Sequence, residues 1–226
     1  MAFAPSHQPA RQLARLGPLA QLRAGRLGRR LPQLLVGLVL YGVGMALMVR
    51  SGLGNMPWDV LHQGLAGHLP LNFGEVVIAV SAVVLLLWVP LREIPGLGTV
   101  LNALVIGVVV NLGLALFSEP HGLGLRVAMM LLGLALNALA TAMYIGSQFG
   151  PGARDGLMTG LHRRTGLSIR LVRTSLEVVV VVLGWLLGGT FGVGTVLYAV
   201  VIGPLVQLLL PSFTVALTPV ENGRRV

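Results

Sequence analysis

The chain contains two aspartates, Asp59 and Asp155, which lie 96 residues apart in equivalent surroundings. Each follows a glycine-rich stretch and opens a short segment compatible with a helix, 59–65 in one case and 155–161 in the other. A carboxylate in the first turn of a helix accepts exposed backbone N–H groups, so both aspartates could be structural caps. The segments could instead line a cavity inside a membrane. In that case the carboxylates could bind a proton, a cation or an amine, and the N-termini of the helices could bind an anion. The sequence leaves both interpretations open.

The residues around the two aspartates differ. Trp58 precedes Asp59, and its ring is interpreted as an anchor at the membrane interface. His62 follows on the same helical face, so a proton or metal site is conceivable, but two ligands do not make a metal site. A His62–Asp59 hydrogen bond at the outer interface is the favoured interpretation. Arg154 occupies the position of the tryptophan in the second copy, where it is expected to pair with Asp155 beside it.

Few other polar residues interrupt the apolar segments. Glu177 follows Arg173 by four residues, which favours a salt bridge along one helix face, whereas an unpaired carboxylate there would be a functional candidate. Asn111 and Gln207 are also 96 residues apart. Hydrogen bonds between helices are the favoured interpretation of these amides, and a polar path is the alternative. No catalytic residue, metal site or cofactor is predicted. The candidate substrate or ion pathway comprises Asp59, Asp155, Trp58, His62, Arg154, Glu177, Asn111 and Gln207.

The aspartates belong to an internal repeat. Residues 51–65 align with 147–161 without a gap, and the same offset aligns 98–101 with 194–197. Across residues 37–112, roughly a third of positions are identical to their partners, a level of self-similarity that indicates duplication. The two halves of the chain are therefore expected to share one structure.

The composition is that of an integral membrane protein. Of 226 residues, 55% are hydrophobic and 10% are charged, whereas soluble domains carry about 25% charged residues. The chain has no cysteine, which excludes disulfides, thiolate metal sites and cysteine nucleophiles. All 16 basic residues are arginines. They cluster at the ends of apolar segments, so they are interpreted as topology signals and not as a nucleic-acid-binding surface.

An all-α fold with six transmembrane helices is predicted, since each apolar segment can cross a core about 30 Å thick. The spans are placed at 32–50, 74–91, 98–117, 126–146, 170–189 and 195–210. The arginines that follow alternate spans put both termini in the cytoplasm. Each copy of the repeat holds three spans, so the second copy has inverted topology. The expected parts are an Arg/Pro-rich cytoplasmic tail (1–31), two three-helix repeats (32–118 and 119–211) and a C-terminal tail (212–226).

Small residues recur at helical spacing in both repeats. Such pairs allow close approach of helix backbones. Spans one and four, and spans three and six, are therefore expected to cross near a pseudo-two-fold axis. The packing residues are Gly42, Ala46, Ala138, Ala142, Ala103, Gly107, Ala199 and Gly203.

Three motifs carry a resemblance to a known family. They are PWDVLHQGL at 57–65, IPGLGTVLNALVIG at 94–107 and GPGARDGLMTGL at 150–161. With the glycine-rich exit from the first span, the chain resembles the YczE/YyaS/YitT group of bacterial membrane proteins, most closely its YczE branch, over residues 32–210. The resemblance implies a multi-span protein of the bacterial cytoplasmic membrane, from a largely uncharacterised family, and carries no catalytic residues.

Two functions follow from these patterns. Inverted repeats with broken segments favour a small-molecule permease or secondary transporter with a central site between the repeats. The alternative is an accessory or assembly protein that acts through its cytoplasmic Arg-rich connection. An enzyme is not expected, because the chain has no GxSxG or HExxH motif. The expected partners are the lipid bilayer and a small-molecule substrate, with a homo-oligomer left open and no nucleic acid.

Overall fold

The computed structural model describes residues 17–217, and this part of the chain is helical throughout, without strands. Both outer parts of the expected tails, 1–16 and 218–226, lie outside the described residues. The helices are α1 (Pro18–Arg23), α2 (Leu27–Ser51), α3 (Pro57–Ala66), α4 (Phe73–Leu91), α5 (Leu97–Leu116), α6 (Leu123–Gly146), α7 (Ala153–Thr165), α8 (Ile169–Leu186) and α9 (Val193–Phe213).

Five of these helices, α2, α4, α5, α6 and α9, are long and apolar enough to cross a membrane. The remaining expected span, 170–189, corresponds to α8, which has 18 residues and is not among the five. Its first nine residues include Arg170, Arg173 and Glu177, and these charges lower its apolar content.

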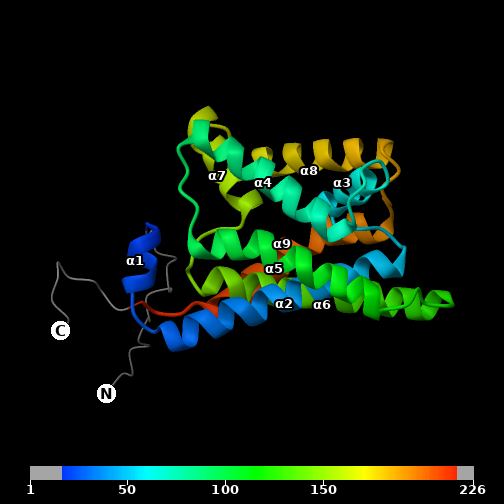
Figure 1. Ribbon diagram of the computed structural model, residues 1–226, viewed down its shortest axis with the longest axis horizontal. Helices are drawn as coiled ribbons and strands as arrows, with labels where there is room; N and C mark the ends of the chain where they lie inside the picture. The colour runs from blue at the N-terminus through cyan, green and yellow to red at the C-terminus, as the bar shows by residue number, and fades with distance from the viewer. Residues whose placement is uncertain (1–16, 218–226) are drawn as a thin grey trace, which may run out of the picture.

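The long helices lie along one common direction (Figure 1). The short helices α3 and α7 lie at opposite ends of the molecule, and α7 is at the end where α2 starts, on the other side of the helix layer (Figure 1). Helix α3 packs on α8, and α7 packs on α4, so each short helix contacts a long helix from the other half of the chain. The same contact is thus made twice with the roles of the halves exchanged.

The most extensive contact joins α2 and α6, the expected crossing of spans one and four. Glycines make it close: a Cβ added at Gly44 would lie 2.8 Å from the carbonyl oxygen of Gly133. The small residues expected here, Gly42 and Ala46, instead face α5, where a Cβ added at Gly42 would lie 2.7 Å from Val109. They occupy a different face of α2, which lies between α5 and α6. Their partners Ala138 and Ala142 are buried on α6.

The expected crossing of spans three and six is wrong. Helices α5 and α9 do not form a close crossing, because α5 packs on α2 and α4 instead. Ala103 is buried and Gly107 contacts α4, whereas on α9 Ala199 is exposed and Gly203 has no atom near its Cβ position. Identical small residues in the two repeats therefore have different surroundings.

Candidate functional site

The chain breaks away from α2 and from α6 in the same way. Gly52 and Gln148, which are equivalent under the repeat, both have a φ of 61°. Gly54 and Gly150 follow with φ of 121° and 106°. These values lie in the region that favours glycine, which explains the glycine-rich sequence at both exits.

Each break is held by the other half of the chain. The Gly194 N–H, at the start of α9, donates to the Leu53 carbonyl at 2.9 Å. The Gly98 N–H, at the start of α5, donates to the Phe149 carbonyl at 2.8 Å. Both bonds join residues that are equivalent under the 96-residue offset, so each half of the chain holds the break of the other half in the same way.

Two arginines also tie the halves together. Arg30 is fully buried, although the sequence assigned it to the cytoplasmic tail, because α2 begins at Leu27 and not at residue 32. It and Arg126 bind the carbonyl oxygens at the end of the broken helix in the other half. The bonds are Arg30 Nε to Ser147 O (2.9 Å), Arg30 Nη2 to Gln148 O (2.9 Å), Arg126 Nε to Ser51 O (2.7 Å) and Arg126 Nη2 to Gly52 O (2.8 Å).

Asp59 and His62 form a buried pair on α3. Both side chains have 0% exposure, and His62 Nδ1 lies 3.0 Å from Asp59 Oδ1. The expected hydrogen bond is therefore present, but it lies inside the protein and not at an interface. The N-cap of α3 is Met56, and the Asp59 carboxylate does not cap the helix. Asp59 Oδ2 and His62 Nε2 have no hydrogen-bond partner in the described part of the chain.

Arg154 reaches from α7 to this pair. Its Nη2 lies 3.8 Å from Asp59 Oδ1, and its Cζ lies 5.2 Å from the ring centroid of Trp58. Trp58 is 9% exposed, so it is a buried platform for the guanidinium and not the expected interfacial anchor. The expected local pair of Arg154 with Asp155 is also wrong, since Arg154 faces the aspartate of the other half.

Asp155 has a different partner. Its Oδ2 accepts a hydrogen bond from the hydroxyl of Tyr144 at 2.5 Å. The N-cap of α7 is Gly152, and no side chain caps that helix. Neither aspartate is therefore used as a helix cap, and both point into polar surroundings at the centre of the molecule.

Three tyrosines that were not among the predicted site residues lie around the aspartates. Tyr41 and Tyr144 pack edge to face with centroids 6.3 Å apart, and the Tyr198 hydroxyl donates to Asn137 Oδ1 at 3.4 Å. These are all the tyrosines in the chain. Tyrosine in membrane helices is enriched at the interfaces, so Tyr41, in the middle of α2, is the one whose position in the sequence could have identified it. Tyr144 lies two residues before the end of α6 and Tyr198 five residues after the start of α9, and the sequence carries no such signal for them.

Several of these side chains line a cavity with two compartments, but Asp59 and His62, which are fully buried, line neither compartment. The wide compartment has a volume of about 210 Å³ and is lined by residues of α2, α3, α6, α7, α8 and α9. Its polar lining includes Trp58, Arg154, Asp155, Arg173, Glu177 and Gln207. The narrow compartment has a volume of about 50 Å³ and includes Ser81 and Asn102. Tyr41, Tyr144, Arg154 and Asp155 line both.

The two compartments are equivalent under the repeat. The lining pairs are Val77 with Arg173, Ser81 with Glu177, Asn102 with Tyr198, Ile106 with Ile202, and Arg154 with Trp58. They differ in width because α4 packs tightly on α5, where a Cβ added at Gly107 would lie 2.7 Å from the Gly74 carbonyl. Helices α8 and α9 lack this close packing, and Gly203, the equivalent of Gly107, faces open space.

Two further candidates have clear positions. Glu177 accepts the expected salt bridge from Arg173 Nε at 2.8 Å, and both line the wide compartment with Gln207. Asn111 lies outside the cavity: it accepts from the Gly74 N–H at 2.7 Å and fastens the start of α4 to α5. Asn111 and Gln207 are thus equivalent in sequence but not in surroundings.

Apolar helices of spanning length around this polar centre define a multi-pass membrane protein. The sequence profile of the "Family of unknown function (DUF6198)" matches residues 28–211, and the chain belongs to that family. An uncharacterized protein of Haemophilus influenzae is 44% identical over 177 residues, which cover 78% of this chain and 81% of that protein.

Two relatives come from Bacillus subtilis. The uncharacterized membrane protein YczE is 30% identical over 181 residues, 78% of this chain and 83% of YczE. The uncharacterized protein YyaS is 27% identical over 180 residues, 78% of this chain and 90% of YyaS. They confirm the resemblance that the sequence motifs indicated. No solved structure matches the chain.

Proposed function

We propose that the protein is a small-molecule permease that binds its substrate in the central cavity and opens it to alternate sides of the membrane. The observation that carries this proposal is the pair of compartments that are equivalent under the repeat but differ in volume, about 210 Å³ against about 50 Å³. In transporters built from inverted repeats, the two repeats adopt different conformations, and exchange of those conformations moves the opening from one side to the other.

The six spans of this permease are α2, α4, α5, α6, α8 and α9, grouped as two repeats of inverted topology. Helix α8 is included although it carries charges, because Arg173 and Glu177 face the cavity and not the lipid. Charged residues within spanning segments face a protein interior or a water-filled cavity in this way. The placement of α3 and α7 at opposite ends of the molecule supports the inverted arrangement (Figure 1).

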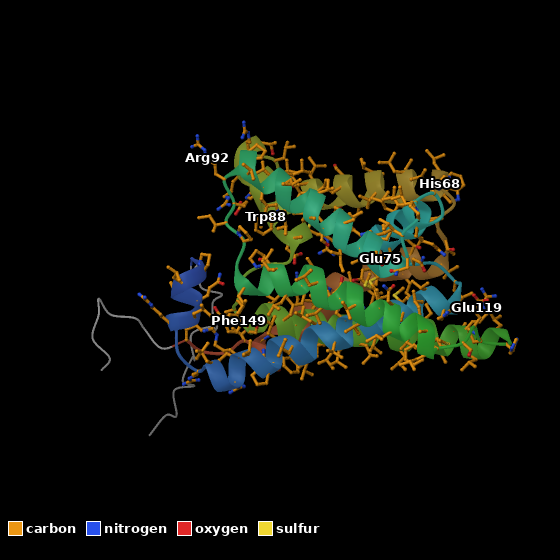
Figure 2. The ribbon with its side chains drawn as sticks, in the orientation of Figure 1. His68, Glu75, Trp88, Arg92, Glu119 and Phe149 are labelled. Atoms are coloured by element: carbon orange, nitrogen blue, oxygen red, sulfur yellow. The ribbon has the colours of Figure 1, made fainter. Side chains whose placement is uncertain are left out.

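The charges favour one orientation in the bacterial cytoplasmic membrane. Arg92 lies at the same end of the molecule as the start of α2, and His68 and Glu119 lie at the opposite end (Figure 2). Arg163 and Arg164 on α7 belong to the same end as Arg92, since both contact the end of α4. By the positive-inside rule this end is cytoplasmic. The wide compartment lies toward it, near the start of α8 and the end of α9.

The alternative of an accessory protein gains no specific support. It relies on the Arg-rich connection as a free docking surface, but Arg163 forms an ion pair with Glu93, and Arg164 donates to the Pro90 carbonyl at 2.5 Å. Two of the arginines in that surface are already bound within the chain.

Cysteine labelling tests the proposal directly, because the natural chain has no cysteine. Gln207→Cys would place a thiol in the wide compartment, and Ser81→Cys would place one in the narrow compartment, where Ser81 is 7% exposed. A membrane-impermeant maleimide should label position 207 from the cytoplasmic side and position 81 from the outer side. Met45→Cys, fully buried in the core, is the control and should stay unlabelled. No labelling of position 81 from either side would contradict alternating access.

A further inference from the structure

Four charged side chains reach the wide compartment, and two of them are already paired. Arg173 donates to Glu177 at 2.8 Å, so these two neutralise each other. Arg154 and Asp155 are neighbours in the chain, yet no ion pair within 4.0 Å joins them in the described residues. The compartment therefore presents one cation and one anion side by side with unused bonding capacity.

The guanidinium of Arg154 is the cationic half. Its nearest carboxylate oxygen, Asp59 Oδ1, is 3.8 Å away, which is too far for a hydrogen bond. Within residues 17–217 it makes no hydrogen bond, although a guanidinium carries five N–H donors. The ring of Trp58 supports it from one side. A ligand carboxylate could take up two parallel N–H···O bonds from it.

The carboxylate of Asp155 is the anionic half. It accepts one hydrogen bond, from the Tyr144 hydroxyl, whereas a carboxylate offers about four acceptor positions. The rings of Tyr41 and Tyr198 also line this part of the cavity. An ammonium group is attracted both by a carboxylate and by aromatic faces.

The size and walls of the compartment restrict the ligand further. Its volume of about 210 Å³ is below the ~300–1,000 Å³ of ordinary small-molecule sites, so the ligand is small. Met158, Ile202 and Val206 give it an apolar wall. We propose that the site binds a small zwitterion of the amino-acid class, with its carboxylate on Arg154, its ammonium on Asp155 and a compact apolar side chain against that wall.

The unused donors of Arg154 and the unpaired carboxylate of Asp155 favour a zwitterion over an ion of either sign. A simple carboxylate would leave Asp155 without a counter-charge. A simple amine would leave the N–H donors of Arg154 without an acceptor, since Asp59 faces Arg154 at 3.8 Å, beyond hydrogen-bond distance. Unpaired charges inside a membrane protein are costly, whereas a zwitterion adds no net charge to the cavity. This inference rests on the proposed function, since it names the substrate class of the same cavity.

Thermal unfolding of the purified full chain in mild detergent tests the inference, because a ligand that binds the folded state raises its stability. The probes are L-leucine, 4-methylpentanoate, which lacks the ammonium, and 3-methylbutylamine, which lacks the carboxylate. Leucine should raise the melting temperature at a concentration at least tenfold lower than either single-charge probe. Arg154→Gln should abolish the leucine shift and keep the weak amine shift, and Asp155→Asn should abolish it and keep the weak carboxylate shift.

Glu75→Gln is the matched control, because Glu75 is exposed at the start of α4 and outside the cavity. It should respond to leucine as the wild type does. The inference is overturned if leucine causes no shift, if one single-charge probe matches it, or if leucine shifts the melting temperature of either cavity variant as much as that of the wild type. The permease proposal is tested separately, because the cysteine labelling above needs no ligand.

Discussion

Arg30 and Arg126 lie 96 residues apart and bind equivalent carbonyl oxygens with the same two guanidinium nitrogens, Nε and Nη2. Each belongs to one half of the chain and closes the broken helix of the other half. The last carbonyls of a helix lack partners inside it, and a charged donor satisfies them well. The same pair of arginine–carbonyl hydrogen bonds, formed once in each half, holds the two breaks in place.

Loss of these hydrogen bonds should destabilise the protein. We expect Arg30→Gln to lower the free energy of unfolding by about 1–3 kcal/mol, because it leaves buried carbonyls without donors. Arg126→Gln should cost less, since the Arg126 bond to Gly52 is exposed. Arg29→Gln is the control, because Arg29 is exposed beside Arg30. Thermal unfolding in detergent measures the stability of all three variants. If Arg29→Gln lowers it as much as Arg30→Gln does, the stabilising role of the Arg30 hydrogen bonds is contradicted.

The two equivalent glycines Gly107 and Gly203 should respond differently to substitution. A Cβ at Gly107 would lie 2.5 Å from Ile78 Cγ1, so Gly107→Ala should lower the free energy of unfolding by about 1–3 kcal/mol. A Cβ at Gly203 meets no atom within 4 Å, and Gly203→Ala should leave stability nearly unchanged. Thermal unfolding of both variants checks this. Equal losses would mean that α8 packs on α9 as α4 packs on α5.

Arg154 should be coupled energetically to Asp59 and not to Asp155. In a double-mutant cycle, Arg154→Gln and Asp59→Asn should be non-additive by about 0.5–3 kcal/mol, because the two charges face each other across the halves. The matched cycle of Arg154→Gln with Asp155→Asn should be additive to within about 0.5 kcal/mol. Chemical or thermal unfolding supplies the values. The reverse pattern would mean that Arg154 pairs with Asp155, as the sequence predicted.

The repeat made much of the site predictable. The 96-residue offset identified Asp59 and Asp155 as equivalent, and the glycines around them located both breaks. The offset shows which residues are equivalent but not which ones touch. Arg154 was therefore paired with its neighbour Asp155, when its partner lies in the other half of the chain.

The differences between the halves could not be predicted from the repeat. Gly107 and Gly203 are identical in sequence, and so the sequence assigned them the same packing role. One is crowded and the other is open because the two halves adopt different conformations. Likewise, the sequence placed Arg30 in the N-terminal tail, because the carbonyl oxygen that it binds belongs to Ser147, 117 residues later in the chain.

Distance measurements between spin labels test the central claim, that the two halves exchange conformations. Cysteines at Ala82 and Leu104 report on the α4–α5 spacing, and cysteines at the equivalent Val178 and Val200 report on the α8–α9 spacing. All four positions are exposed, so the labels should not disturb packing, and the chain has no other cysteine.

Double electron–electron resonance in lipid should give two distances for each pair. The α8–α9 pair should show mainly a long distance with a second population at the short α4–α5 distance, and the α4–α5 pair should show the converse. Ligand that binds the cavity should change the ratio of the populations and not the distances. A single distance for each pair, with no overlap between the pairs under any condition, would contradict the account.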